Sequence, residues 1–107
     1  MTRLYVCGQM TGLPDFNFPE FNRVAKALRE CGYDVENPAE NEAPCENPTW
    51  QDWMRVAIPQ MLKCDGVALL LGWSASRGAS LERNLAVAIG MPCRQWEDWF
   101  FSPLGGK

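Results

Sequence analysis

Apolar residues gather in short blocks along the chain, and their spacing switches between that of strands and that of helices. Helical periodicity predicts three helices, which begin near Pro19, Thr49 and Gly78. Compact β-prone runs that end at glycine or proline predict strands before, between and after these helices. The expected strands are residues 4–7, 33–36, 66–71 and 93–96.

Strands that alternate with helices predict a parallel sheet with helices on both faces. We therefore expect an α/β fold, a three-layer sandwich around a parallel sheet of about four or five strands. In such sheets a ligand binds at the edge where the strands end. Three polar loops leave the strands at this edge: residues 8–15, 37–48 and 72–78.

The second predicted helix has the clearest N-terminal capping signal in the chain, but it also contains a proline in its interior. Thr49 and Asp52 have the spacing of a capping box. An apolar stripe follows: Trp50, Trp53, Met54, Ala57, Ile58, Met61 and Leu62. Pro59 interrupts it, and because a proline inside a helix removes a hydrogen bond, we expect a kink there.

Composition limits the chemistry that the chain can perform. Its 107 residues form one domain, and its net charge of −3 offers no basic stripe for a nucleic acid polymer. The count of histidines is 0, which excludes Ser–His–Asp and Cys–His catalysis and histidine-containing zinc sites. Acid–base or nucleophilic catalysis would therefore have to use carboxylates, lysine, tyrosine or cysteine.

The 5 cysteines form no CxxC pair and no metal-ligand spacing, so we expect no metal and no cofactor. Their odd number and the apolar surroundings of several of them suit free thiols in a reducing cytoplasm. The N-terminus is too short and polar for a signal peptide, and no apolar run approaches a membrane span. These features predict a cytoplasmic protein without a membrane partner.

Glu82 is the strongest candidate for chemistry. It follows the loop that leaves the buried strand and shares a helical row with Gly78 and Ala86, at the ligand edge of the sheet. The helix dipole there favours its ionised form, although the periodicity alone favours a glutamate that only complements the dipole. An apolar stripe runs beside this row: Leu81, Leu85 and Ile89. Asp65 precedes the same strand, at the opposite edge, and is expected to be structural.

The first loop lacks a dinucleotide fingerprint, but Gly8 and Gly12 allow backbone N–H groups to approach a ligand closely. Four residues would add polar contacts: Gln9, Thr11, Asp15 and Asn17. A plain turn between strand and helix fits the spacing as well.

The third loop combines Ser76, Arg77 and Gly78 at a helix N-terminus, where orphan N–H groups suit an anion. Serine is also a common N-cap, so this arrangement has a purely structural explanation too. Trp73 would stack on a base or sugar, or pack against another tryptophan.

The C-terminal segment carries four aromatic residues in a short run: Trp96, Trp99, Phe100 and Phe101. A small monomer does not readily bury so many rings, which favours a subunit contact. We therefore divide the chain into a domain over residues 1–95 and an aromatic tail over 96–107. The expected assembly is a homo-oligomer, most simply a twofold dimer.

Several segments match one known pattern, and together they cover nearly the whole chain through Pro92. They are residues 4–12, 17–21, 37–38, 53–55, 64–67, 72–73 and 76–82. This pattern resembles the nucleoside 2-deoxyribosyltransferase superfamily, and within it a small branch common in phages and bacteria. The match brings Met10 and Asn37 into the candidate binding site.

The resemblance implies a flavodoxin-like (Rossmann-like) sheet and cleavage or transfer at the N-glycosidic bond of a nucleoside or nucleoside 5′-monophosphate. In that superfamily a glutamate after the central strand attacks the anomeric carbon, and the matching position here is Glu82. A glycosyl-enzyme intermediate would then pass to water or to another base with retention.

Ala57 and Ser76 stand where members of the superfamily carry aspartates. The first change removes a general acid or sugar ligand, for which Asp15 is the candidate substitute as proton donor. The second places a hydroxyl beside Arg77, where a 5′-phosphate would be attracted. Ala57 favours the alternative function, a nucleotide-binding sensor or sequestering module that does not cleave its ligand. An interaction protein acting through the aromatic tail is a third possibility.

Overall fold

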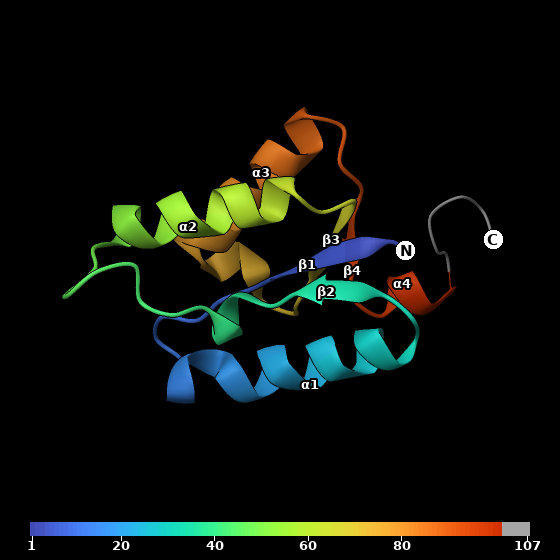
Figure 1. Cartoon of the computed structure of the whole chain (residues 1–107), viewed down its shortest axis with the longest axis horizontal. Coiled ribbons are helices and arrows are strands. Elements are labelled where there is room, and N and C mark those ends of the chain that lie inside the picture. The colour runs from blue at the N-terminus through green and yellow to red at the C-terminus, as the bar shows by residue number, and fades with distance from the viewer. Residues whose placement is uncertain (102–107) are drawn as a thin grey trace.

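The computed structural model describes residues 1–101 and arranges them in the three layers that the alternating pattern predicts (Figure 1). The middle layer is a sheet of four parallel strands: β1 (Arg3–Cys7), β2 (Asp34–Glu36), β3 (Gly66–Leu69) and β4 (Cys93–Gln95). Their spatial order is β2-β1-β3-β4, so the chain adds strands first on one side of β1 and then on the other. This order is flavodoxin-like, and ligands in such sheets bind beside the point of reversal.

Four helices form the outer layers: α1 (Phe18–Glu30), α2 (Trp50–Leu62), α3 (Arg77–Ala88) and α4 (Asp98–Phe101). Three short 3₁₀ turns lie in the loops: η1 (Pro14–Asn17), η2 (Pro38–Glu40) and η3 (Trp73–Ala75). Helix α1 covers one face of the sheet, while α2 and α3 cover the opposite face (Figure 1).

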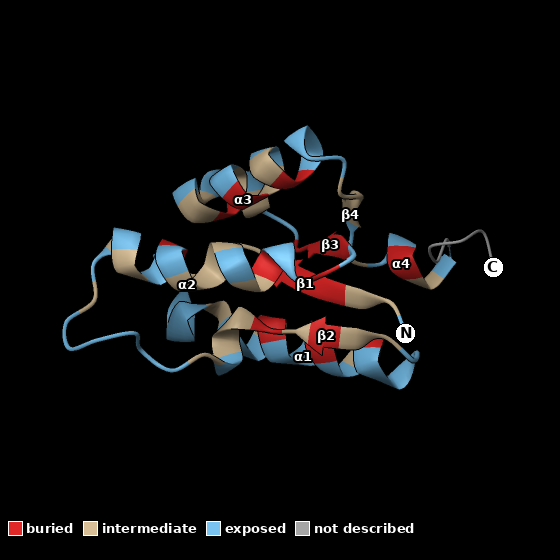
Figure 2. Cartoon of the chain, turned by 45° about the horizontal axis from the view of Figure 1, so that its top comes forward, coloured by how far each residue is buried: buried red, intermediate tan, exposed pale blue. Residues whose placement is uncertain are grey.

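The core consists of two clusters separated by the sheet, and β1 contributes to both. Figure 2 shows that buried residues are concentrated in the strands β1 and β3. Successive side chains of a strand point to opposite faces. Leu4 and Val6 therefore pack against α1, whereas Tyr5 and Cys7 point toward α2 and α3. All four side chains are at most 1% exposed, as expected of a central parallel strand buried on both faces.

Helix α2 begins where the sequence predicts. The Thr49 side chain accepts a hydrogen bond from the Asp52 backbone N–H, and Asp52 caps the Thr49 N–H in return. The helix continues from Trp50 to Leu62 without a break at Pro59, whose ring lies on the exposed side. Only Met54 and Met61 of the predicted apolar stripe are buried. Trp50, Trp53 and Ala57 border a cavity, and Leu62 is 48% exposed.

Helix α4 packs the first part of the aromatic tail against the domain that precedes it. Trp99 is 0% exposed, and its indole N–H donates to the Val67 carbonyl at 3.0 Å. A Cβ at Gly66 would lie 2.5 Å from the Trp99 ring, so glycine is required for this close approach. Trp99 is therefore a core residue, which corrects its predicted place in a subunit contact. Phe101 remains 83% exposed, and the tail beyond it lies outside the described residues.

Within residues 1–101, no helix combines the length and the apolar character needed to cross a membrane.

Candidate functional site

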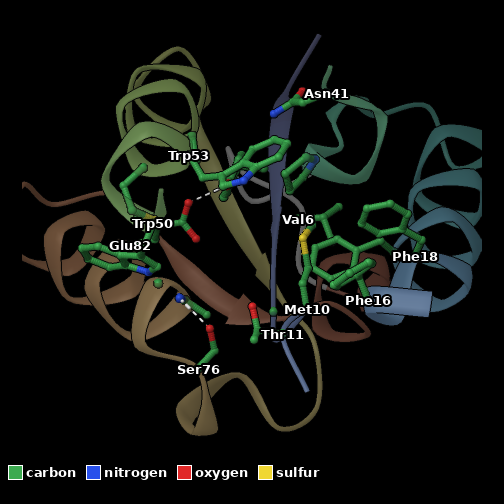
Figure 3. Close-up of a pocket in the computed structure, with 18 residues that line it drawn as sticks. Val6, Met10, Thr11, Phe16, Phe18, Asn41, Trp50, Trp53, Ser76 and Glu82 are labelled. Carbon is green, nitrogen blue, oxygen red and sulfur yellow. Dashed lines mark hydrogen bonds between the residues drawn. The ribbon is translucent and has the colours of Figure 1, made fainter. Parts of the chain in front are cut away.

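A cavity of about 490 Å³ opens at the edge of the sheet where β1 and β3 end (Figure 3). The loop after β1 and the first turns of α1, α2 and α3 form its walls. Most of the lining is apolar, and aromatic rings stand on two sides of it: Phe16 and Phe18 on one, Trp50 and Trp53 on the other. A cavity of this size, with few polar groups, is typical of a small-molecule site.

Helix α3 turns its row of small residues toward the sheet. Ala79, Glu82 and Ala86 are buried, whereas Leu81 and Ile89 of the neighbouring apolar stripe are 41% and 54% exposed. The small side chains let α3 lie close to both neighbouring elements: the Cys7 thiol of β1 donates to the Ala79 carbonyl at 3.5 Å, and a Cβ at Gly78 would lie 3.2 Å from the Met54 sulfur of α2. This close packing carries the Glu82 carboxylate into the cavity.

Both carboxylate oxygens of Glu82 are held by side chains of β1. The Tyr5 hydroxyl donates to Oε2 at 2.5 Å, and the Cys7 thiol lies 3.6 Å from Oε1. Tyr5 and Cys7 are two positions apart on one strand, so their side chains leave the same face of the sheet. Glu82 itself is only 6% exposed but lines the cavity. The carboxylate is therefore fixed in position and still accessible to a ligand.

Burial raises the pKa of Glu82 from 4.5 to about 7, and the hydrogen bonds from Tyr5 and Cys7 offset part of that rise. The position of Glu82 near the start of α3 predicts that the helix dipole favours ionisation. The structure shows that desolvation outweighs it, because the carboxylate is removed from water. At neutral pH Glu82 is therefore protonated to a greater extent than an exposed glutamate would be.

Of the binding residues expected in the loop after β1, Gly8, Met10 and Thr11 line the cavity. Gln9 and Gly12 are not among the lining residues. The Gln9 side chain donates to the Thr11 carbonyl, and its own carbonyl accepts from Asn17, so this residue stabilises the loop itself.

A strained turn follows in the same loop. Asp15, Phe16 and Asn17 have φ values of 51°, 53° and 62°, a left-handed conformation that non-glycine residues rarely adopt in succession. This turn places Phe16 in the cavity wall and leaves Asp15 exposed, outside the lining. The proton-donor role predicted for Asp15 does not match this position.

Of the residues predicted to bind a ligand in the third loop, some line the cavity and others make only structural contacts. The Ser76 hydroxyl caps α3 by accepting from the Ala79 N–H at 3.1 Å, while Ser76 and Gly78 both line the cavity. The Arg77 guanidinium stacks on Trp50, 3.6 Å from the ring centroid, and is not a lining residue. Trp73 lies outside the lining as well and packs against the core cluster on the α3 side of the sheet.

Asn37 is buried away from the cavity, so the structure assigns it a structural role. It accepts from the Ala39 N–H and donates to Asn22, which holds η2 against α1. The amide that does line the cavity belongs to Asn41. Asp65 accepts from the Arg3 N–H at 2.8 Å at the opposite edge of the sheet, and this contact confirms its structural role.

Several residues of the site did not emerge from the sequence as candidates. Tyr5 and Cys7 looked like ordinary strand positions, and Trp50 and Trp53 looked like helix core. The alternation along β1 is the one sequence signal that would have placed Tyr5 and Cys7 together on one face.

The lining that the structure describes contains one carboxylate, Glu82, with hydroxyl and amide groups around it. Such a carboxylate can attack an electrophilic carbon when ionised and donate a proton when neutral. In the described part of the chain, no three His, Cys, Asp or Glu side chains lie together as metal ligands.

Comparison of the sequence with curated proteins finds no match. The family described as "Domain of unknown function (DUF4406)" matches residues 2–94, a span that includes Glu82 and all of the described cavity lining. Because this match covers most of the chain, the chain belongs to the DUF4406 family.

Proposed function

We propose that the chain cleaves, or transfers across, the N-glycosidic bond of a nucleoside or nucleoside 5′-monophosphate, with Glu82 as nucleophile. The observation that carries the proposal is the buried Glu82 carboxylate, held by Tyr5 and Cys7 at the floor of a cavity with aromatic walls. The resemblance of the loop and helix motifs to nucleoside 2-deoxyribosyltransferases supports the same substrate class.

In the proposed reaction, ionised Glu82 attacks the anomeric carbon, and the C–N bond breaks with its electron pair leaving on the base. The resulting glycosyl ester is then opened by water or by a second base, which restores the carboxylate and retains the anomeric configuration. In hydrolysis the departing base gains one proton and the attacking water loses one. Because Asp15 lies outside the lining, we assign this proton exchange to solvent water.

Tyr5 and Cys7 would hold the carboxylate at a fixed orientation during the attack. Positioning of this kind lowers the entropic part of a barrier. The pKa of about 7 keeps a substantial ionised fraction available at neutral pH.

A second candidate function is nucleotide binding without cleavage. One observation favours it: Ala57 lines the cavity where the resembling superfamily carries an aspartate, so Glu82 has no carboxylate partner among the described lining residues. Most glycoside hydrolases use a pair of carboxyl groups.

The test incubates the protein with a panel of ribo- and 2′-deoxyribonucleosides and their 5′-monophosphates, and chromatography follows the release of free base. We expect release by the wild type and none by Glu82→Gln, in which the amide keeps the shape but not the nucleophile. Glu30→Gln is the matched control, because Glu30 is an exposed glutamate of α1 outside the cavity. A 2-fluoro sugar analogue should leave a covalent adduct on Glu82.

Undiminished release by Glu82→Gln would overturn the assignment of the nucleophile. Tight binding of a panel member by the wild type, with no release of base from any of them, would establish the binding module instead.

A further inference from the structure

The described lining of the cavity contains one side chain that carries a charge near neutral pH, and that charge is negative. Glu82 is this side chain, and no lysine or arginine is among the lining residues that the structure describes. Arg77 lies outside the lining, with its guanidinium on the Trp50 ring. The carboxylate therefore has no cationic side chain beside it in the cavity, and buried charges are normally paired. Such a site favours a ligand that brings its own positive charge.

The aromatic rings of the cavity have the same electrostatic preference. Phe16 and Phe18 stand on one side of the cavity, and Trp50 and Trp53 stand on the other (Figure 3). Phe16 is 60% exposed and Trp53 is 39% exposed, so a large part of each ring is free to meet a ligand. The face of an aromatic ring is negative and attracts a cation, most strongly where water is excluded.

The cavity offers no second carboxyl group to protonate a departing base. Ala57 lines it where the resembling superfamily carries an aspartate, and Asp15 lies outside the lining. The Tyr5 hydroxyl already donates to Glu82. A neutral base leaves with a negative charge unless an acid protonates it. A heterocycle that is a cation while attached to the sugar needs no proton, because the electron pair of the broken bond neutralises it.

We propose that this site prefers nucleosides whose heterocycle carries a positive charge at the glycosidic nitrogen, such as an N-ribosylpyridinium, over neutral nucleosides. The proposal rests on the proposed function and names the substrate class of the same site. Glu82 is the counter-ion of the bound ring as well as the nucleophile, and Phe16 and Trp53 present their ring faces to the positive charge.

The proposed reaction balances without an acid. An oxygen of ionised Glu82 bonds to the anomeric carbon while the C–N bond breaks, and the electron pair of that bond moves to the ring nitrogen. The ring leaves as a neutral heterocycle. Water then opens the glycosyl ester, restores the carboxylate and loses one proton to the solvent. Each turnover therefore releases one proton, whereas hydrolysis of a neutral nucleoside to a neutral base releases none.

Glu82 is the group in the described lining that titrates near neutral pH. Tyr5 and Cys7 approach it from β1, and burial raises the pKa of both side chains. The other described lining residues of α2 and α3 are uncharged. A cation beside Glu82 favours its ionised form. The affinity for a cationic ligand should therefore rise with pH up to the pKa of Glu82, about 7, and then level off.

The first experiment compares two probes of the same shape by NMR titration of the wild type at pH 8. 1-Methylnicotinamide is a cation, and 3-methylbenzamide is its uncharged isostere, with carbon in place of the ring nitrogen. Neither has a glycosidic bond to cleave. We expect the cation to bind about ten-fold more tightly or better. Equal affinities, or tighter binding of the uncharged probe, would overturn the inference, and this comparison depends on no variant.

The charge of Glu82 is tested with a matched pair of variants. Glu82→Gln should weaken binding of the cation by about ten-fold and leave the affinity for the isostere unchanged. Glu30→Gln removes the same charge from an exposed glutamate outside the lining and should keep the wild-type preference. A preference that persists in Glu82→Gln would show that Glu82 is not the counter-ion. Thermal melting of each variant verifies that it is folded.

The pH dependence separates a counter-ion from a structural role of Glu82. In the wild type, the affinity for 1-methylnicotinamide should be about ten-fold or more weaker at pH 5 than at pH 8, because protonation removes the negative charge. The affinity for 3-methylbenzamide should not change. In Glu82→Gln both affinities should be independent of pH. A pH dependence shared by the two probes would contradict the assignment.

The aromatic contribution is tested at Trp53. Trp53→Leu should reduce the preference for the cation by about three-fold or more, whereas Trp53→Phe, which keeps a ring face, should retain most of it. An equal loss of affinity for both probes in Trp53→Leu would show that the ring contributes apolar surface alone.

The second experiment measures turnover of nicotinamide riboside, a cationic nucleoside, against adenosine, guanosine, cytidine and uridine. Chromatography follows the released heterocycle, and a pH-stat follows the released proton. We expect kcat/KM for nicotinamide riboside to exceed that for each neutral nucleoside by about 100-fold, with one proton released per nicotinamide.

Failure of this inference is distinguishable from failure of the proposed function. Equal kcat/KM for nicotinamide riboside and the neutral nucleosides would support cleavage and overturn the preference. Tighter binding of the cationic probe, without release of nicotinamide, would support the cationic site and remove only the cleavage reaction. If neither probe bound and no nucleoside were cleaved, both would fail.

Discussion

The Tyr5 hydroxyl donates a 2.5 Å hydrogen bond to Oε2 of Glu82, and this contact joins β1 to α3 across 77 residues of sequence. It fixes one carboxylate oxygen at the floor of the cavity. The hydrogen bond also lowers the pKa of Glu82, against the larger effect of burial, which raises it to about 7. The Tyr5 hydroxyl therefore affects both the position and the pKa of the Glu82 carboxylate.

Tyr5→Phe should shift the ionisation of Glu82 to higher pH. The variant removes the donor that stabilises the charged carboxylate while burial is unchanged, so the pKa rises further. The acidic limb of the pH profile for base release should move to higher pH by the same amount. Above this pKa, unfolding by urea should show a loss of about 1.5–3 kcal/mol, typical of a hydrogen bond to a charged group.

Tyr33→Phe is the control for this prediction. The Tyr33 hydroxyl donates to the Trp99 carbonyl, far from the carboxylate in question. This variant should lose stability without any shift of the pH profile. An identical profile in Tyr5→Phe and the wild type would show that Tyr5 does not influence Glu82.

Glu82→Gln should stabilise the protein at alkaline pH. The pKa of Glu82 is about 7 in the folded chain and its ordinary value is 4.5, so between these pH values the folded state binds more protons than the unfolded state. The stability of the wild type should therefore fall as pH rises from 4.5 to 7, and then level off. The difference of about 2.5 pH units corresponds to about 3 kcal/mol in the buried site.

The measurement is the urea midpoint at pH 4 and at pH 8 for both proteins. Glu82→Gln should resemble the wild type at pH 4 and exceed it at pH 8. Glu30→Gln, which alters an exposed glutamate, should follow the wild type at both pH values. A pH-independent difference between Glu82→Gln and the wild type would contradict a raised pKa.

The predicted homodimer can be tested at the exposed end of α4. With Trp99 in the core, Phe101 is the most exposed of the aromatic residues of α4 and the largest apolar surface there that a partner could cover. We expect light scattering to show a dimer at micromolar concentration, and Phe101→Ser to raise its dissociation constant at least ten-fold. A monomer at that concentration, in the wild type, would refute the subunit contact.

Arg77 provides the test for recognition of a 5′-phosphate. Its guanidinium rests on Trp50, whose ring lines the cavity, and the first N–H groups of α3 lie beside it. We expect nucleoside 5′-monophosphates to bind more tightly than the matching nucleosides, because a charge-assisted contact contributes about 1.5–3 kcal/mol. Calorimetry should show that Arg77→Ala removes most of the difference, whereas Arg55→Ala, an exposed arginine of α2, does not.

Local signals in the sequence determined the order of elements and the edge of the sheet at which the cavity opens. The Thr49 capping box started α2, short apolar runs marked the strands, and the alternation of both implied the parallel sheet. Glu82 could be placed near the ligand edge because it follows the central strand by one loop. These features depend on residues close together in the chain, and hydrogen bonding within a turn or helix is enough to specify them.

Tertiary structure alone decided which side chains meet. Residue spacing could not show that α3 would bury Glu82 and leave Leu81 exposed, because both rows have helical periodicity and the choice depends on how closely α3 approaches β1. Burial of Trp99 required the space that Gly66 leaves by having no side chain. Asn41 lines the cavity in place of the predicted Asn37, because Asn37 holds η2 against α1. The pKa of Glu82 was decided in the same way, since desolvation depends on every neighbour that excludes water from the carboxylate.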